Sequence, residues 1–524
     1  MSEVEGRGAA WTDAPKGRGA DWTEERGTSD EGRRRPKAAP EASGRHRMSP
    51  QNTIERALAV AECDDCVVIA DETSSANLRW AGNTLTTNGV SRSRQLTVIA
   101  ISRSGEEASV GVVSRAGVHD DQIEEVVRAA EKAASEGSPA EDARPLLGPG
   151  DSEAFRMDAP AGNRGPGWDD PVTGTEIGIF REFAGALGQA FDAAGTAGRK
   201  LYGFAEHSVV NTFTGTSTGL RLRHDQPTGK VDLNAKSADM ARSAWAGQGT
   251  RDFSDIDVGA LDADLARRLD WAARRVELPA GRYETILPPA ALADLLVYLY
   301  WSSGAKDALD GRTVFSKPGG GTRVGERLAS LPVTLRSDPV ALGLECQPFV
   351  VAHASSRESS LFDNGLALRP TAWIRDGALA ALTQTRYTAD LTSLPVTPAI
   401  GNLILDGPSG PEGPGRASLD DMIASTGRGL LLTCLWYIRE VDPQTLLLTG
   451  LTRDGVYLVE NGEVVGAVNN FRFNESPVAM LGRLAEVGTT VPTLPREWGD
   501  YFTRTAMPPA RVEGFNMSSV SQAS

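Results

Sequence analysis

The chain has 524 residues, enough for roughly three to four domains of ordinary size. Its formal net charge of −15 argues against a nucleic-acid backbone or an anionic membrane surface as the main partner. No apolar stretch approaches the roughly 18 residues of a membrane-spanning helix, and the first 47 residues lack the apolar core of a secretory signal. Four cysteines are too few for a disulfide framework, so a soluble, cytoplasmic protein is expected.

Residues 1–47 mix Gly, Pro, Ala and both signs of charge without a periodic apolar face. Such a segment cannot bury enough apolar surface to offset the entropy lost on ordering, so we expect a disordered extension whose removal leaves folding unchanged. Met48 stands directly before the first periodic helix. Translation from Met48 and a functional N-terminal tail are both compatible with this arrangement.

Two α/β units are expected next, over residues 48–150 and 151–277. In each, apolar residues at helical spacing flank runs of strand character, and a Gly/Pro-rich linker near residues 137–167 separates the units. The expected helices lie at 52–61, 120–130, 176–194 and 262–276, and the expected strands at 66–70, 77–80, 96–101, 201–213 and 220–224.

After Leu278 the pattern changes to strands and tight turns, which predicts a β-rich, mainly antiparallel domain over residues 278–515 and a tail over 516–524. Asp376-Gly377 and Asn461-Gly462 lie between apolar runs and are typical of hairpin turns. Further expected elements are a strand at 283–287, a helix at 289–301, a short helix at 419–425 and one long strand at 429–439. The predicted fold class is α+β, with N-terminal α/β units followed by this β-rich domain.

The stretch Gly215–Gly219 matches the Gly-x-Ser-x-Gly pattern of a hydrolase nucleophile elbow. That chemistry needs a helix after the serine, whereas a period-2 strand follows here. We therefore predict a hairpin turn. A hydrolase built on Ser217, His224 and Asp225 is the less favoured alternative.

Two other motifs have plain structural interpretations. Cys63 and Cys66 have the spacing of a redox or zinc half-site, but no second ligand pair follows and the pair ends a helix, so two ordinary thiols are expected. Gly319-Gly320-Gly321 lacks the strand and the Lys-Ser/Thr of a phosphate loop. The five histidines form no helical metal-binding pair.

The C-terminal half carries a long string of motifs in a fixed order. Its main parts are Gly429–Thr433, Trp436-Tyr437, Asp442-Pro443, Leu448-Thr449-Gly450, Gly455, Glu460–Glu463 and Asn470–Ser476, with further matches at Gly401–Leu403, Phe362–Gly365 and Arg511–Phe515. In these motifs the chain resembles the TldD/PmbA family, cytoplasmic metallopeptidase-like proteins described as modulators of DNA gyrase and as processors of ribosomally made peptides. The resemblance runs from about Asn52 to Phe515 and is weakest at its start.

The resemblance implies two kinds of family member that pair as a heterodimer. TldD-type chains carry a His-Glu-x-x-x-His helix and a late Cys-Gly-Lys that supply zinc ligands and a general base. The corresponding helix here, Pro289–Trp301, contains no His, Glu or Cys, and no Cys follows Cys434. Zinc needs such ligands, so the chain resembles the PmbA/TldE type, which lacks the metal site. No catalytic and no metal-binding residue is therefore expected, and zinc is expected only in a TldD-like partner.

This resemblance implies a non-catalytic subunit of a cytoplasmic metallopeptidase complex that processes unfolded or leader peptides. The alternative is a scaffold or binding protein of the gyrase-modulator type without a role in proteolysis. Residues expected to contact peptide or partner are Arg472, Asn470, Asn474, Asp363 and Asn364. Phe471 and Phe473 alternate with Arg472, which predicts both rings on the buried face of a strand and the guanidinium on the other.

Overall fold

The computed structural model describes residues 48–151, 167–408 and 417–521, and the expected N-terminal extension lies outside them. Within these ranges the chain is α+β with a β-rich, mainly antiparallel C-terminal part, as predicted. No helix among the described residues is long and apolar enough to cross a lipid bilayer.

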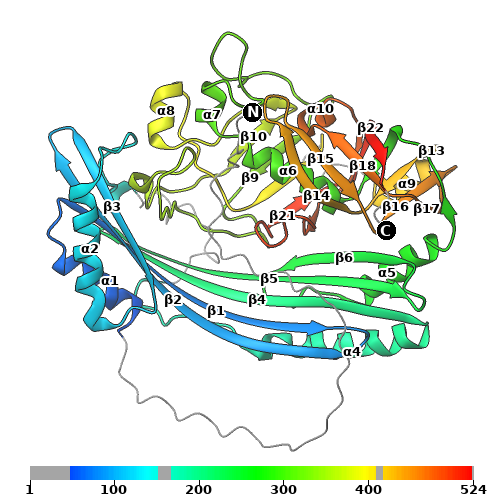
Figure 1. The fold of residues 1–524 in the computed structure, drawn as a ribbon, viewed down its shortest axis with the longest axis horizontal. Helices are drawn as coiled ribbons and strands as arrows, with labels where there is room; N and C mark the ends of the chain where they lie inside the picture. The colour runs from blue at the N-terminus through cyan, green and yellow to red at the C-terminus, as the bar shows by residue number, and fades with distance from the viewer. Residues whose placement is uncertain (1–47, 152–166, 409–416, 522–524) are drawn as a thin grey trace, which may run out of the picture. The chain divides into compact units, whose positions relative to one another are not determined.

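The N-terminal part forms one six-stranded antiparallel sheet of unusually long strands (Figure 1). In sheet order these are β3 (Glu107–Ala116), β2 (Leu85–Ser104), β1 (Asp65–Trp80), β4 (Arg199–Thr216), β5 (Arg221–Ser237) and β6 (Ser243–Thr250). β1 pairs with β4 from Val67↔Thr216 to Trp80↔Gly203, so strands from both expected α/β units share this sheet.

Helices cover one face of the sheet, the face of the even-numbered β1 residues such as Ala76 and Leu78. These helices are α1 (Pro50–Val60), α2 (Ile123–Glu136), α4 (Arg181–Thr196) and α5 (Val258–Trp271), with the short 3-10 turns η1 (Asp120–Gln122) and η2 (Ile177–Phe180) preceding α2 and α4. The opposite face carries Val67 and Ile69, which pack against Phe362 from the C-terminal part.

The C-terminal part contains two further sheets around one large core. The six-stranded sheet runs β11 (Ala378–Leu379), β10 (Thr371–Arg375), β9 (Thr334–Ser337), β12 (Leu403–Asp406), β21 (Thr505–Met507) and β20 (Val491–Thr493). The ten-stranded sheet runs β14 (Leu435–Asp442), β15 (Leu447–Thr452), β18 (Phe471–Glu475), β22 (Ala510–Val520), β8 (Gly281–Leu287), β13 (Arg428–Leu432), β16 (Val456–Glu460), β17 (Glu463–Val468) and β7 (Arg275–Val276), with β19 (Leu484–Val487) paired to β22.

Helix α6 (Pro289–Trp301) lies in the core formed with both C-terminal sheets. It begins after Pro288, where a proline at the first helical position suits the missing N–H donor, and continues as an almost unbroken apolar run. The remaining short helices are α7 (Ala305–Leu309), η3 (Leu361–Asp363), α8 (Arg386–Thr392), α9 (Leu419–Ser425) and α10 (Pro477–Leu481).

Several predicted boundaries differ from the structure. The strands expected at 66–70 and 77–80 are one strand, β1, and the helix expected to end at 276 ends at Trp271. The long strand expected at 429–439 is two strands, β13 and β14, with Thr433 and Cys434 between them. β13 then pairs with β8 and β16, whereas β14 pairs with β15 at the edge of the same sheet.

Candidate functional site

Helix α6 occupies the place where the resemblance expects metal ligands, and its one ionisable carboxyl is Asp294. Asp294 is fully buried: its Oδ1 accepts from the backbone N–H of Glu497 at 2.9 Å, and its backbone oxygen accepts from Trp498 Nε1 at 2.9 Å. Burial raises the pKa of this carboxyl well above its ordinary value. Among the described residues, no three His, Cys, Asp or Glu side chains gather closely enough to hold a metal ion.

Strand β18 presents the predicted contact residues Arg472 and Asn474 on one face. Phe471 and Phe473 are completely buried on the other face, which confirms the predicted alternation. The exposed Arg472 donates from Nη1 to Thr449 Oγ1 at 3.3 Å and forms no ion pair with a carboxylate in the described ranges. Asn470 directly precedes the strand.

Asn474 has a buried side-chain oxygen. Its side-chain Oδ1 has no hydrogen-bond partner among the described residues, while its backbone oxygen accepts from Asn516 Nδ2 at 3.0 Å. An unpaired buried acceptor of this kind is energetically costly.

Asp363 and Asn364 lie elsewhere, at the η3 turn against the N-terminal sheet, and both are buried. Asp363 accepts from Arg386 Nε at 2.7 Å and from the Arg386 backbone N–H at 3.0 Å. The amide of Asn364 accepts from the Ala352 backbone N–H at 2.7 Å and donates to the Ala352 carbonyl at 3.0 Å. The structure therefore gives these two side chains partners within the chain, and it does not bring them together with Arg472 and Asn474 on β18.

The Gly215–Gly219 motif joins β4 to β5 as the predicted hairpin turn. Ser217 Oγ accepts from the Cys66 backbone N–H at 3.1 Å, while His224 Nε2 lies 3.0 Å from Gln226 Oε1. Asp225 binds Arg223 in a buried ion pair at 2.8 Å. These three side chains have separate partners, so they do not form a nucleophile, base and orienting carboxylate.

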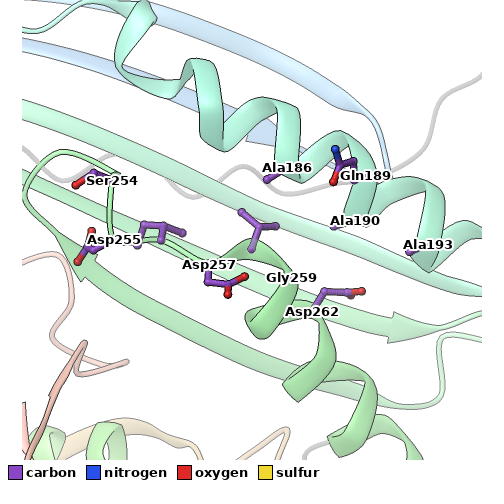
Figure 2. Close-up of a pocket in the computed structure, with 11 residues that line it drawn as sticks. Ala186, Gln189, Ala190, Ala193, Ser254, Asp255, Asp257, Gly259 and Asp262 are labelled. Carbon is purple, nitrogen blue, oxygen red and sulfur yellow. The ribbon is translucent and has the colours of Figure 1, made fainter.

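A groove of about 590 Å³ lies between α4 and the start of α5 (Figure 2). Alanines of α4 line one side, and three carboxylates line the other. Each carboxylate already has a partner: Asp255 accepts from Thr250 Oγ1, Asp257 caps α5 by accepting from the Ala260 backbone N–H, and Asp262 binds Arg199. Each of the three carboxylates therefore already accepts a hydrogen bond from within the chain, and Asp262 is also paired with the charge of Arg199.

A second hollow, on the opposite face of the N-terminal sheet, brings together two residues that sequence reasoning did not connect. Asp71 on β1 and His353 in the C-terminal part line it together, with His353 Nε2 3.6 Å from Asp71 Oδ2. The residues are 282 positions apart, and neither belongs to a recognisable motif. Only pairing of β1 within the sheet and docking of the loop that carries His353 bring them together.

The fold and these surfaces define an α+β protein whose β-rich half encloses an apolar helix. Residues 280–519 match the model of the PmbA/TldA metallopeptidase C-terminal domain. Residues 280–519 therefore form a domain of the PmbA/TldA metallopeptidase C-terminal type. A search of curated proteins finds no significant match to the sequence.

Solved structures share this fold over nearly their whole length. TldE from Thermococcus kodakarensis is 17% identical with a TM-score of 0.70, and the match covers 89% of this chain and 99% of that one. A candidate modulator of a DNA gyrase from Thermotoga maritima is 15% identical with a TM-score of 0.68, covering 89% and 99%. A candidate gyrase modulator from Bacteroides thetaiotaomicron is 14% identical with a TM-score of 0.68, covering 90% and 98%.

Proposed function

We propose that this chain is the non-catalytic, PmbA/TldE-like subunit of a cytoplasmic metallopeptidase complex that processes unfolded or leader peptides. A TldD-like partner supplies the zinc and the general base. The observation that carries the proposal is helix α6, which stands at the place of the ligand-bearing helix and is apolar and buried along nearly its whole length. A single enclosed carboxyl, Asp294, offers one possible ligand where zinc needs three or four.

Peptide binding is assigned to the ten-stranded sheet. β14 lies at its edge, with Tyr437 54% exposed and Val441 56% exposed. An extended peptide can add to such an edge through backbone hydrogen bonds irrespective of its sequence. Arg472 and Asn474 lie two strands further in, where a guanidinium suits a carboxylate of the peptide or of the partner subunit.

The first experiment measures metal content and peptide cleavage for the chain alone, the TldD-like partner alone and the two mixed. We expect the chain alone to hold no stoichiometric zinc after chelation and reloading, and cleavage to require the partner. About one tightly bound zinc per isolated chain would overturn the proposal.

The second experiment tests the β18 surface with Arg472→Ala in a partner pull-down and in the cleavage assay. Arg428→Ala is the matched control, because Arg428 is also an exposed arginine of the ten-stranded sheet, 67% exposed beside Glu460. Arg472→Ala should fold normally and weaken partner or peptide binding. If both variants behave like the unmodified chain, Arg472 has no role in binding.

A binding function without proteolysis is the second candidate, because two of the similar solved structures are described as candidate modulators of DNA gyrase. Gyrase supercoiling measured with and without the chain separates the two functions. A change in supercoiling together with no partner-dependent cleavage would favour this alternative.

A further inference from the structure

A small polar hollow of about 350 Å³ opens on the helix-free face of the N-terminal sheet. Three neighbouring strands build its floor in register, with Asp71 on β1 opposite Gln95 on β2 and opposite Thr212 on β4. The loop from Gln347 to His353 supplies the rest. The lining residues are Asp71, Thr73, Ser93, Gln95, Val210, Thr212, Gln347, Val351 and His353.

Asp71 carries the only carboxyl group among the nine lining side chains. Its Oδ1 accepts from Thr212 Oγ1 at 2.6 Å, whereas its Oδ2 lies 3.6 Å from His353 Nε2, too far for a direct hydrogen bond. Burial raises the pKa of Asp71, and the Thr212 hydrogen bond and the His353 imidazole act in the opposite direction. A cationic donor placed in the hollow would stabilise this carboxylate.

His353 is held by a short chain of hydroxyl groups. Its Nδ1 lies 3.2 Å from Oγ1 of the fully buried Thr97, and that oxygen lies 2.8 Å from Ser114 Oγ. These contacts fix the imidazole so that Nε2 faces Asp71 across the hollow.

Gln347 places an unpaired hydrogen-bond donor at the same hollow. Its Nε2 is buried and has no hydrogen-bond partner among the described residues, although the residue lines the hollow. An amide N–H₂ only donates, so an occupant that satisfies it must carry an acceptor oxygen. A ligand that suits this hollow therefore carries a cationic donor beside Asp71 and a carbonyl or carboxylate oxygen beside Gln347.

We propose that this hollow binds the amino terminus of a peptide, with the terminal ammonium on Asp71 and the first carbonyl oxygen on Gln347. An ammonium has three donors, and the hydroxyls of Thr73 and Ser93 line the same hollow as further acceptors. The volume is near the lower end for ligand pockets, which suits one or two terminal residues rather than a longer segment. The assignment rests on the proposed role in peptide processing and adds the end of the peptide that is recognised.

The test is calorimetric titration of the full chain, without any partner subunit, with trialanine, N-acetyl-trialanine and free alanine. We expect trialanine to bind and acetylation to weaken binding at least about tenfold, because it removes the charge. Equal binding of the acetylated and free peptides, or no binding of trialanine at millimolar concentration, would overturn the proposal. If free alanine binds as tightly as trialanine, the ligand is an amino acid and the peptide proposal is wrong.

Asp71→Asn should also weaken trialanine binding at least about tenfold. Glu206→Gln is its control, since Glu206 opposes Asn77 on the same face of the same sheet, six residues along β1 from Asp71. Identical affinities of the two variants would refute the role of Asp71. If Asp71→Asn fails to fold, the comparison of acetylated and free peptide on the unmodified chain still decides the question.

Neither arm needs the partner subunit or cleavage. Binding of trialanine with no partner-dependent cleavage would therefore refute the proposed function and leave this site standing. Partner-dependent cleavage together with equal binding of the free and acetylated peptides would refute this site and leave the proposed function standing.

Discussion

The guanidinium carbon of Arg496 lies 3.6 Å from the centroid of the Trp436 ring. The same carbon lies 5.6 Å from the ring of Trp245, which belongs to β6 of the N-terminal sheet, whereas Trp436 belongs to β14 of the ten-stranded sheet. The Nε and Nη1 atoms of Arg496 are buried and have no hydrogen-bond partner in the described ranges. Arg496 therefore joins the two halves of the molecule through its contacts with these two indole rings.

Replacing Arg496 by alanine should lower the free energy of unfolding by about 1 to 2 kcal/mol, because a partly desolvated cation–π contact is lost. Arg496→Lys should recover only part of the lost stability, since the lysine ammonium lacks the planar guanidinium that stacks on an indole ring. Urea unfolding followed by tryptophan fluorescence measures the effect. The exposed Arg428→Ala serves as control and should stay within about 0.5 kcal/mol of the unmodified chain. Equal effects of the two alanine variants would show that the stacking contributes nothing.

Gly111 on β3 lies directly against the backbone of α2. A Cβ at this position would lie 2.1 Å from the Ala130 carbonyl oxygen and 2.2 Å from the Ala134 nitrogen. Gly111→Ala should therefore push the helix off the sheet and destabilise the chain by about 1 to 3 kcal/mol or more.

Thermal unfolding measures this loss, and Gly89→Ala on β2 is the control. A Cβ at Gly89 would lie an ordinary 3.6 Å from Asn77 Nδ2, so that variant should melt like the unmodified chain. A Gly111→Ala protein with an unchanged melting temperature would contradict the close packing of β3 on α2.

The enclosed carboxyl of Asp294 should make stability depend on pH. Its pKa is raised by burial in the folded chain, so the folded state holds this proton more tightly than the unfolded state. Its contribution is fully present below the unfolded pKa and is lost as pH rises toward the folded pKa. Asp294→Asn removes this dependence and should gain stability relative to the unmodified chain as pH rises from about 5 to 8.

Urea unfolding across that pH range measures the difference between the two proteins. Asp192→Asn, a change at an exposed position of α4, is the control and should run parallel to the unmodified chain. An Asp294→Asn curve that also runs parallel would mean that Asp294 is ionised in the folded protein.

The four thiols should differ sharply in reactivity. A hydrogen bond from Cys66 lowers the pKa of the half-buried Cys63 thiol and raises that of the buried Cys66 thiol. Burial raises the pKa of Cys346 to about 11 and that of Cys434 to about 12. The thiolate is the reactive form, so a thiol reagent near neutral pH should label Cys63 first.

Mass spectrometry after brief labelling of the native chain counts the modified thiols. One modified thiol is expected, and Cys63→Ser should abolish it. Labelling of Cys66, Cys346 or Cys434 at the same rate would show that their burial is not maintained in solution.

Much of the fold follows from local chemistry that is legible in the sequence. Pro288-Pro289 and the apolar run after them predicted α6, because proline suits a helix start and such a run must be buried. Asp376-Gly377 and Asn461-Gly462 predicted two hairpins, and all four residues adopt positive φ, from 49° at Asp376 to 84° at the two glycines. These elements depend on a few neighbouring residues, so the sequence determined them by itself.

The length of β1 was decided only by the tertiary structure. Its middle, from Asp71 to Ser75, is polar, and the sequence therefore predicted a gap between two strands. β2 and β4 bond to it on both sides across that stretch, and backbone pairing with two long neighbours holds an extended conformation that apolar burial alone would not specify.

The candidate functional residues also divide into those that the sequence indicated and those that only the tertiary structure brought together. The match of the C-terminal part to the family and the lack of His, Glu and Cys in α6 could be read from the sequence, since both depend on residue types at short spacing. The approach of His353 to Asp71 and of Arg496 to Trp436 was not, because each pair joins segments far apart in sequence. Contacts of this kind exist only after the sheets have packed, and no local pattern of charge or hydropathy encodes them.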